Sequence, residues 1–149
     1  MGDDLALLYE QDILGWAEET AAQLRARDWE HLDLEHLIAE VEALGISQKK
    51  ELIRRLVVLL EHLLKRLHVS SPNDYRGWEQ TIRTQQTELT VLLDVVPSLR
   101  SRWDISLDKA WPLALKNVRQ EYPSIVFPAQ WEGDRTIEAL LDRNFGLPS

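Results

Sequence analysis

Apolar side chains recur at every third or fourth position along most of the chain, with polar side chains between them. This spacing is typical of amphipathic helices and differs from the strict alternation of strands. The sequence therefore predicts a chain that is helical almost throughout. The predicted helices cover, in order, about residues 4–27, 34–44, 48–68, 75–95, 99–120 and 136–143.

The apolar faces of the first and third predicted helices differ in width. One stripe on the first helix consists of Leu5, Tyr9, Ile13, Trp16, Thr20 and Leu24. The wider face of the third consists of Leu52, Ile53, Leu56, Val57, Leu59, Leu60, Leu63, Leu64 and Leu67. A helix with so wide an apolar face must be covered on several sides, so we expect the third helix to be the most buried element.

Capping residues and a glycine set the expected ends of the second and third helices. Asp33 precedes the second helix and suits an N-cap. Gly45 is expected to end that helix in the left-handed conformation, because glycine has no side chain to oppose it. Ser47 then suits the N-cap of the third helix. These residues predict a short turn between two separate helices.

Prolines interrupt the second half of the chain. The stretch 71–74, Ser-Pro-Asn-Asp, separates the third predicted helix from the fourth. Pro97 and Ser98 are expected to end the fourth helix and cap the fifth. Pro112 lies within the fifth helix, where it is expected to start a new turn or to cause a kink.

The segment 122–133 combines two prolines and a glycine with large apolar residues. So many apolar side chains argue against disorder, and we expect an ordered, extended strap over the bundle. A short last helix follows, and Phe145 is expected to plug the end. The predicted fold is all-α. It is one domain over residues 1–149, with a bundle of five main helices, the Pro-rich strap and a short C-terminal helix.

Composition points to a compartment and excludes some kinds of site. The 149 residues include no cysteine, so disulfides and thiolate metal sites are excluded and a reducing compartment is compatible. The N-terminus has no basic stretch followed by an apolar run, and the longest apolar run, 56–60, is far shorter than a membrane span. We therefore expect a soluble, cytoplasmic protein without a membrane partner.

The formal net charge of −8 argues against nucleic acid as a partner, because a phosphate backbone requires a basic surface. The best basic candidates lie in one predicted helix: Lys49, Lys50, Arg54, Arg55, Lys65 and Arg66. Glu51 and Glu61 interrupt them and no aromatic residue stands among them, so we interpret them as a solvated helix face.

Landmarks along nearly the whole chain occur in the order seen in one bacterial family. They are Tyr9 with Asp12 and Trp16; Leu32-Asp33; Leu37-Ile38 with Glu40, Val41 and Glu42; Leu44-Gly45 with Ser47; His62-Leu63-Leu64-Lys65; Trp78 with Ile82 and Gln85; Pro97-Ser98-Leu99; and Leu140-Leu141-Asp142 with Phe145. As a set they resemble the family known as domain of unknown function 29, which is frequent in cyanobacteria. The resemblance implies an all-helical fold and no particular activity, because a fold alone does not define a function.

Six polar residues are candidates for a functional role: Asp12, Glu40, Glu42, His62, Lys65 and Gln85. All but His62 and Lys65 lie within or beside a predicted apolar face. A partly buried Asp12 could act as a general acid or base, although an ion pair across the bundle is the simpler interpretation. Glu40 and Glu42 flank the apolar face of their helix on opposite sides, so they cannot share a proton or a metal within one chain.

His62 and Lys65 lie one turn apart on the face opposite the leucines of the third predicted helix. If that helix is central, this second face meets another helix, a second subunit or a ligand. The simpler interpretation is a solvated or salt-bridged stripe. Gln85 falls within the apolar stripe of the fourth helix, where an amide needs hydrogen bonds. We expect it to tie two helices together or to contact a ligand.

A metal or cofactor site finds little support in the sequence. His36 and Glu40 are one turn apart and offer two ligands from one face, so they are weak metal candidates. The sequence lacks the His-Glu-x-x-His signature, the serine-nucleophile elbow and a glycine-rich phosphate loop. We expect neither a resident metal nor a cofactor.

Two hypotheses for the function follow. The leading one is a non-enzymatic interaction module that binds another protein, or a second copy of itself, through helical surfaces. It is favoured by a well-defined architecture without a catalytic or cofactor signature. The alternative is an enzyme or small-ligand-binding bundle whose pocket collects Asp12, Glu40, His62 and Lys65 from three helices.

Overall fold

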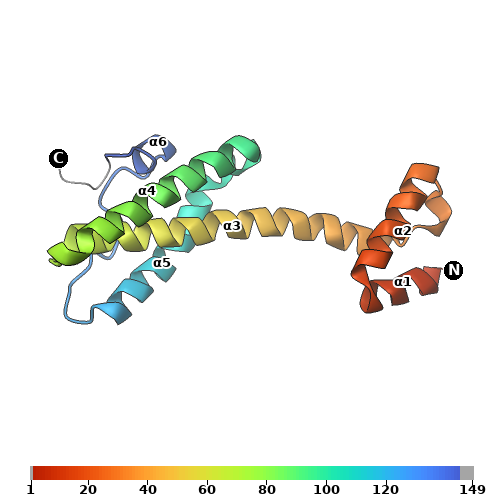
Figure 1. Cartoon of the computed structure of the whole chain (residues 1–149), viewed down its shortest axis with the longest axis horizontal. Helices are drawn as coiled ribbons and strands as arrows, with labels where there is room; N and C mark the ends of the chain where they lie inside the picture. The colour runs from red at the N-terminus through yellow and green to blue at the C-terminus, as the bar shows by residue number, and fades with distance from the viewer. Residues whose placement is uncertain (1, 145–149) are drawn as a thin grey trace. The chain divides into compact units, whose positions relative to one another are not determined.

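The structure, a computed structural model, describes the backbone of residues 2–144 and the side chains of residues 4–144. All regular elements in this range are helices, which confirms the all-α prediction (Figure 1). The α-helices are α1 (Gly2–Gln11), α2 (Ile13–Ala26), α3 (Leu34–His68), α4 (Pro72–Val95), α5 (Trp103–Glu121) and α6 (Ile137–Leu140). The 3₁₀ helices η1 (Trp29–His31) and η2 (Pro97–Arg102) precede α3 and α5.

The chain divides into two compact units, Met1–Ser47 and Gln48–Ser149. The first unit holds α1, α2, η1 and the N-terminal part of α3. The second unit holds the rest of α3 together with α4, η2, α5, the strap and α6. One helix, α3, therefore belongs to both units, and one domain over residues 1–149 stays a prediction.

The helix predicted over residues 4–27 is wrong in one respect, because Asp12 divides it into α1 and α2. Asp12 has a non-helical backbone, and its side chain accepts a hydrogen bond from the backbone N–H of Gly15 at 3.0 Å. This N-cap satisfies a donor that the first turn of α2 leaves free. Gly15 permits the close approach, because a Cβ there would lie 2.7 Å from Oδ2 of Asp12.

The break at Asp12 changes the apolar face predicted for this segment. Leu5, Trp16 and Thr20 are buried, as that face requires. Ile13 and Leu24 are exposed instead. The apolar face was predicted as if one helix ran through position 12. Because α1 and α2 are separate helices, residues before and after Asp12 do not follow one helical register, and the predicted face is therefore not continuous.

The connection from α2 to α3 lies between two capping residues. Arg27 closes α2 in the left-handed conformation, with φ 57° and ψ 35°. Asp33 begins α3, where its carboxylate accepts a hydrogen bond from the backbone N–H of His36 at 3.4 Å. The predicted N-cap at Asp33 is therefore confirmed.

The predicted break at Gly45 is wrong, because α3 is one helix of 35 residues that contains both Gly45 and Ser47. Neither residue caps a helix. A glycine inside a helix costs about 0.5–1 kcal/mol relative to alanine, which is too little to end a helix by itself. Good helix formers follow at 48–52, and no proline enforces a stop.

The second unit has a continuous apolar core. In this unit α4 and α5 lie along α3, and α6 lies beside α4 (Figure 1). The leucines expected to make α3 the most buried element are almost fully enclosed: Leu52, Leu56, Leu59, Leu60, Leu63 and Leu64. Leu67 differs, since half of its surface is exposed. Ion pairs at the margin join Arg66 to Glu79 of α4 at 2.9 Å and Lys65 to Glu121 of α5 at 2.8 Å.

Prolines in the second unit mark the starts of helices. Pro72 lies in the first turn of α4, so this helix begins three residues earlier than expected. Pro97 opens η2, and α5 begins only at Trp103. The fixed φ and missing N–H of proline suit these first-turn positions. Pro112 lies inside α5, which continues beyond it to Glu121.

The predicted strap follows α5 as an extended segment, and no regular helix forms over residues 122–136. Phe127 of this segment is buried in the apolar core. Trp111 of α5 donates a hydrogen bond from Nε1 to the carbonyl of Ala129 at 2.9 Å. These contacts hold the strap against α5, as the apolar content of the segment predicts.

The last helix, α6, is shorter than expected. Its N-cap is Thr136, whose hydroxyl accepts a hydrogen bond from the backbone N–H of Ala139 at 3.2 Å. Leu140 is fully buried and attaches α6 to the core. The predicted plug, Phe145, lies outside the described residues.

Candidate functional site

Four apolar side chains are exposed on one face of the N-terminal part of α3. They are Leu34, Ile38, Val41 and Leu44, with 58%, 48%, 64% and 66% of their surface exposed. At about 100° per residue they fall within about 120° of one another around the helix. We call these four residues the α3 stripe. Single exposed apolar residues are common, but a contiguous row on one helix face indicates a binding surface.

The α3 stripe continues along the same face of the helix into the core of the second unit. Steps of three or four residues lead from Val41 through Gly45 and Gln48 to Leu52 and Leu56. Both of these leucines are fully buried in the core cluster of the second unit. One face of one helix is therefore covered in the second unit and exposed in the first.

Within the first unit, α1 and α2 contact another side of α3. The hydroxyl of Tyr9 donates to Oε1 of Glu40 at 2.5 Å. Nε1 of Trp16 donates to Oδ2 of Asp33 at 3.2 Å. Glu40 and Asp33 lie roughly a quarter of a turn around the helix from Val41. The packing of the first unit therefore leaves the α3 stripe exposed.

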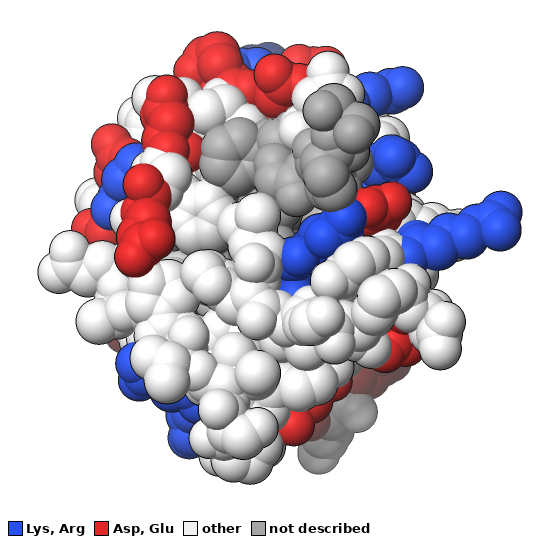
Figure 2. Space-filling view, turned by 90° about the vertical axis from the view of Figure 1, so that its left-hand side faces the viewer, with Lys and Arg blue, Asp and Glu red and all other residues white. Residues whose placement is uncertain are grey.

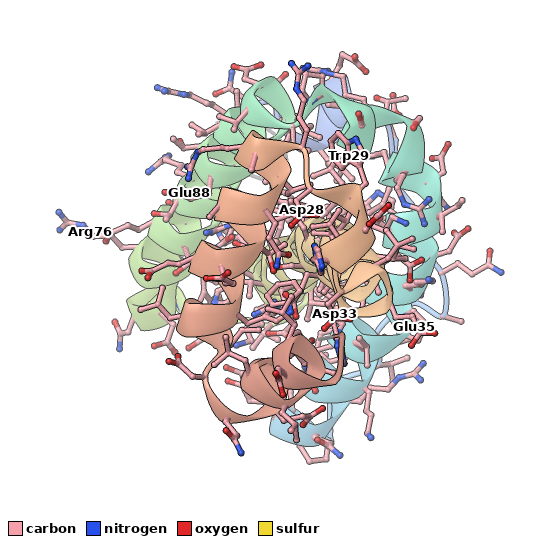
Figure 3. The ribbon with its side chains drawn as sticks, turned by 90° about the vertical axis from the view of Figure 1, so that its right-hand side faces the viewer. Asp28, Trp29, Asp33, Glu35, Arg76 and Glu88 are labelled. Carbon is pink, nitrogen blue, oxygen red and sulfur yellow. The ribbon has the colours of Figure 1, made fainter. Side chains whose placement is uncertain are left out.

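A network of polar and aromatic side chains makes this contact between the helices of the first unit. The ring of His36 stacks on Tyr9 with centroids 3.9 Å apart, and Trp16 meets Tyr9 edge-on at 5.1 Å. Nδ1 of His36 lies 2.6 Å from Oδ2 of Asp33. Asp33 lies at the start of α3 (Figure 3), so one carboxylate organises the approach of α2 and the first turn of α3.

Protonation states in this network favour a structural role. Burial alone would raise the pKa of Asp33, but hydrogen bonds from His36 and Trp16 outweigh burial, and the pKa is lowered. Asp33 is therefore ionised at neutral pH and is unsuited to act as a general acid. The hydrogen bond to Glu40 raises the pKa of Tyr9, so the phenol keeps its proton.

A second aspartate–histidine pair lies in the connection to α3. Nδ1 of His31 is 2.7 Å from Oδ1 of Asp28, which Figure 3 labels. In residues 4–144, no three His, Asp or Glu side chains are arranged to hold a metal ion. The weak metal candidates, His36 and Glu40, are both engaged in the polar network of the first unit.

Two further sequence candidates, Asp12 and Glu42, are exposed. Asp12 serves as the N-cap of α2. Glu42 lies beside the α3 stripe, and among the described residues no ion pair involves it. Glu40, on the other flank, is half-buried against Tyr9. Glu42 is therefore the candidate whose charge is available to a partner.

His62 and Lys65 lie on α3 in the second unit. Lys65 is buried, and its Nζ forms the ion pair with Glu121. His62 is half-buried, and its Nδ1 lies 2.8 Å from the carbonyl of Val58 one turn earlier. Lys65 is therefore salt-bridged to a neighbouring helix, whereas the contact of His62 with Val58 lies within its own helix.

The glutamine buried in α4 is Gln86, whereas the sequence placed Gln85 in the apolar stripe. Gln85 is half-buried, and its Oε1 accepts a long hydrogen bond from Arg55 of α3 at 3.4 Å. Gln86 is 2% exposed and donates to the carbonyls of Leu140 at 3.1 Å and Asp142 at 2.8 Å. The C-terminal segment covers the side of α4 that carries Gln86, and local periodicity does not reveal this contact.

The four residues of the predicted pocket belong to different surroundings. Asp12 and Glu40 lie in the first unit, and His62 and Lys65 lie in the second. Each contacts a different neighbour; these are, in the same order, Gly15, Tyr9, Val58 and Glu121. Within each unit, the structure shows no hydrogen bond or ion pair between the two members.

A cavity of about 460 Å³ lies between α5 and the strap. Trp111 and Trp131 line it, with their rings edge to face at 6.1 Å. Asp108 and Arg135 form an ion pair of 2.9 Å in its wall. An aromatic cavity of this size suits a small ligand, although no polar candidate from the sequence lines it.

Charge is unevenly distributed over the second unit. Figure 2 shows one end of this unit, where charged side chains lie around a broad uncharged area. Exposed apolar side chains of the second unit include Leu67 and Val126, with 50% and 91% of their surface exposed.

Sequence reasoning missed the α3 stripe as a site, because it assigned those residues to a short helix covered by the bundle. Helix length is the signal that could have revealed it. The uninterrupted α3 has 35 residues, whereas α4 has 24 and α5 has 19. A helix of 35 residues is about 50 Å long, because each residue adds about 1.5 Å, and so it extends through both units.

These features define the class: an all-helical protein with an exposed apolar helix face. The chain belongs to the family described as domain of unknown function DUF29, which matches residues 8–146. This match confirms the resemblance, and the description assigns no activity. No curated protein and no solved structure matches the chain.

Proposed function

We propose that this protein is a non-enzymatic interaction module that binds another protein through helical surfaces, with the α3 stripe as its docking face. The observation that carries the proposal is the exposure of four apolar side chains in one row on α3. Burial of such a row against a partner removes apolar surface from water, which favours association.

The size of the α3 stripe suits a partner that presents an amphipathic helix. Full burial of a leucine, isoleucine or valine side chain contributes about 1.5–3 kcal/mol. Because about half or more of each stripe residue is exposed, the stripe contributes about 4–7 kcal/mol before the cost of association. A helix laid along the stripe would bury these residues at positions one turn apart.

Nucleic acid is not the expected partner. Three of the basic residues considered from sequence, Arg55, Lys65 and Arg66, form ion pairs with glutamates inside the fold. Arg66 also lies over the ring of Tyr75 at 3.8 Å. Side chains held in this way are poorly available to phosphates, and the net charge of −8 adds repulsion.

The cytoplasm is the compartment that we propose for this module. A chain without cysteine is compatible with a reducing environment. Within residues 2–144, none of the helices combines the length and the apolar character that crossing a membrane requires.

Binding of a small molecule is the second candidate, and the cavity between α5 and the strap favours it. This version of the enzyme or ligand-binding alternative does not use Asp12, Glu40, His62 or Lys65. Tryptophan fluorescence of the purified protein would change when a compound binds beside Trp111. Loss of that change in Trp111→Phe would show that the compound binds in this cavity.

The test of the docking proposal compares two glutamate substitutions on α3. Val41→Glu places a charge within the α3 stripe. Ile46→Glu is the matched control, because Ile46 is 50% exposed and lies roughly 140° away around the helix. Each tagged variant captures proteins from an extract of the native host at physiological salt. Binding of the captured partner is then reconstituted from purified components.

The proposal expects one stoichiometric partner that the wild type and Ile46→Glu retain and that Val41→Glu loses, with unchanged helicity by circular dichroism. Equal retention by both variants would place the docking face elsewhere. If the protein turned over a small molecule, and Asp12→Ala or Lys65→Ala abolished that activity with unchanged helicity, the protein would be an enzyme. That result would contradict the proposed interaction module.

A further inference from the structure

We propose that the cavity between α5 and the strap binds a small organic cation, in which an ammonium group is carried on an aromatic or other apolar body. This inference rests on the second candidate function, because it names the class of ligand for the same cavity. It is independent of the α3 stripe. All residues that line the cavity lie in the second unit, so the cavity depends on no contact between the two units.

The cavity has an apolar floor and a polar mouth. Leu60 of α3 is fully buried and Leu107 of α5 is 5% exposed, so these two side chains form the floor. Asp108, Gln130 and Arg135 also line the cavity but are exposed, and they therefore mark its mouth. A ligand that suits this arrangement places an apolar body inward and keeps its polar group at the mouth.

The two tryptophans of the cavity use their N–H donors within the chain. Nε1 of Trp111 donates to the carbonyl of Ala129 at 2.9 Å, and Nε1 of Trp131 donates to the carbonyl of Asp134 at 3.4 Å. An indole has a single donor, so these bonds leave no indole N–H for an anionic ligand. The face of an indole ring carries partial negative charge and attracts cations. The ring of Trp111 therefore favours an ammonium group over a carboxylate.

The charges at the mouth also favour a cation. Nη2 of Arg135 donates to Oδ1 of Asp108 at 2.9 Å, and Nε of Arg135 lies 3.5 Å from Oδ1 of Asp104. Two carboxylates thus surround one guanidinium, and one negative charge is left in excess. An anion would have to compete with both carboxylates for Arg135, whereas a cation is attracted by the excess charge.

Hydrogen bonds to the backbone of the strap hold the cavity in shape. Nε1 of Trp103 donates to the carbonyl of Arg135 at 2.8 Å, and Nη2 of Arg135 donates to the carbonyl of Asp104 at 3.0 Å. Together with the bond from Trp111 to Ala129, they attach the strap to α5 at both ends of the cavity wall. A site that is already formed loses little freedom when a ligand binds.

Three probes with the same ring test the class of ligand: 2-phenylethylammonium, 2-phenylethanol and phenylacetate, which are cationic, neutral and anionic at neutral pH. NMR spectra of the isotope-labelled full chain follow the indole N–H resonances during each titration, and the resonance of Trp111 is identified by its loss in Trp111→Phe. The amine should shift this resonance and bind about fivefold to tenfold more tightly than the alcohol, because only the amine gains the attraction of the ring and the carboxylates. Phenylacetate should bind most weakly.

A charge added at the mouth tests where the ammonium group lies. Gln130→Lys should weaken binding of the amine by about fivefold and leave binding of the alcohol unchanged, because only the amine is repelled. Gln120→Lys is the matched control, since it makes the same change at an exposed position of α5 that does not line the cavity. This control should leave binding of both probes unchanged. Both glutamines are exposed, and circular dichroism should show unchanged helicity in each variant.

Three outcomes would overturn the inference. If none of the probes shifted the Trp111 resonance at about 10 mM, the weakest affinity expected for about nine non-hydrogen atoms, both the inference and the second candidate function would fail. Binding of the alcohol or of phenylacetate as tight as that of the amine would reject the cationic class and leave a small-molecule cavity. Equal weakening of amine binding by Gln120→Lys and Gln130→Lys would place the amine outside this cavity.

Discussion

The two units bury very different shares of their apolar residues. In the second unit, leucines of α3 and side chains from α4, α5 and the strap form a continuous core. In the first, the only buried apolar side chains among the described residues are Leu5 and Trp16. The large apolar residues that the first unit exposes are Leu7, Ile13, Leu14, Leu24, Trp29, Leu34, Ile38, Val41, Leu44 and Ile46. Because α3 belongs to both units, the difference lies in what covers the helix.

The first unit is held together mainly by polar and aromatic contacts and has no extended apolar core among its described residues. Its helices meet through Tyr9, Trp16, Asp33, His36 and Glu40, which form hydrogen bonds and ring contacts instead of an extended apolar core. A unit of this size buries too little surface for high stability by itself. A partner that covers the α3 stripe would therefore stabilise the first unit as well as bind it.

The largest expected contrast comes from the same substitution at two positions of α3. Leu63→Ala should reduce the free energy of unfolding by about 2–5 kcal/mol, because Leu63 is fully buried. Leu44→Ala should change it by less than about 0.5 kcal/mol, because Leu44 is 66% exposed. Urea unfolding of dilute protein, followed by circular dichroism, measures both. Equal losses would show that Leu44 is covered and would remove the contrast between the units.

Removal of the Asp33 carboxylate should selectively loosen the first unit. Asp33→Ala leaves the indole of Trp16 and the ring of His36 without their acceptor and should cost about 1–3 kcal/mol. Hydrogen exchange should then quicken in α1 and α2 and stay unchanged in α4 and α5. The matched control is Asp28→Ala, which breaks the more exposed pair with His31 and should have little effect. Faster exchange throughout the chain would contradict separate stability of the units.

Acid should act on the first unit through the same residue. The pKa of Asp33 is lower in the folded protein than its ordinary value of 3.8, because its hydrogen bonds outweigh its burial. Its contribution to stability is therefore fully present above about pH 4 and is lost as pH falls through the lower folded-state pKa. Tryptophan fluorescence during acid titration should show this loss, and Asp33→Asn should remove that part of the pH dependence. An identical acid transition in Asp33→Asn would assign it to other carboxylates.

A small gain in stability is expected at the end of α2. Arg27 has φ 57°, a conformation that glycine adopts without the steric cost of a side chain. Arg27→Gly should therefore stabilise the first unit by about 0.5–1 kcal/mol. Thermal unfolding monitored by hydrogen exchange of α2 measures the change. A loss of stability would show that the side chain of Arg27 contributes more than its backbone conformation costs.

The sequence predicted those parts of the fold that depend on local pattern. The all-helical class, the N-cap at Asp33, the buried face of 52–64 and the ordered strap all follow from spacing and composition. The break at Asp12 and the continuity through Gly45 were missed, because cap and breaker residues have alternative uses that differ by only about 1 kcal/mol.

The candidate site was harder to predict than the fold. Nothing local distinguishes the exposed leucine at position 44 from the buried leucine at position 63, because both belong to apolar faces of helical spacing. Their different exposure depends on which other elements pack against each position. For the same reason Gln86, covered by the segment around Leu140, was overlooked in favour of Gln85.

The most direct test of the account is the accessibility of the α3 stripe itself. The chain has no cysteine, so single substitutions Val41→Cys, Ala43→Cys and Leu56→Cys each introduce one thiol for labelling in dilute protein. Val41 is 64% exposed, Ala43 lies on the opposite side of the helix and is also exposed, and Leu56 is fully buried. If the α3 stripe is uncovered, the thiol at position 41 should react nearly as fast as that at 43 and far faster than that at 56. A thiol at position 41 as protected as that at 56 would show that the chain itself covers the α3 stripe, which would contradict the proposed docking face.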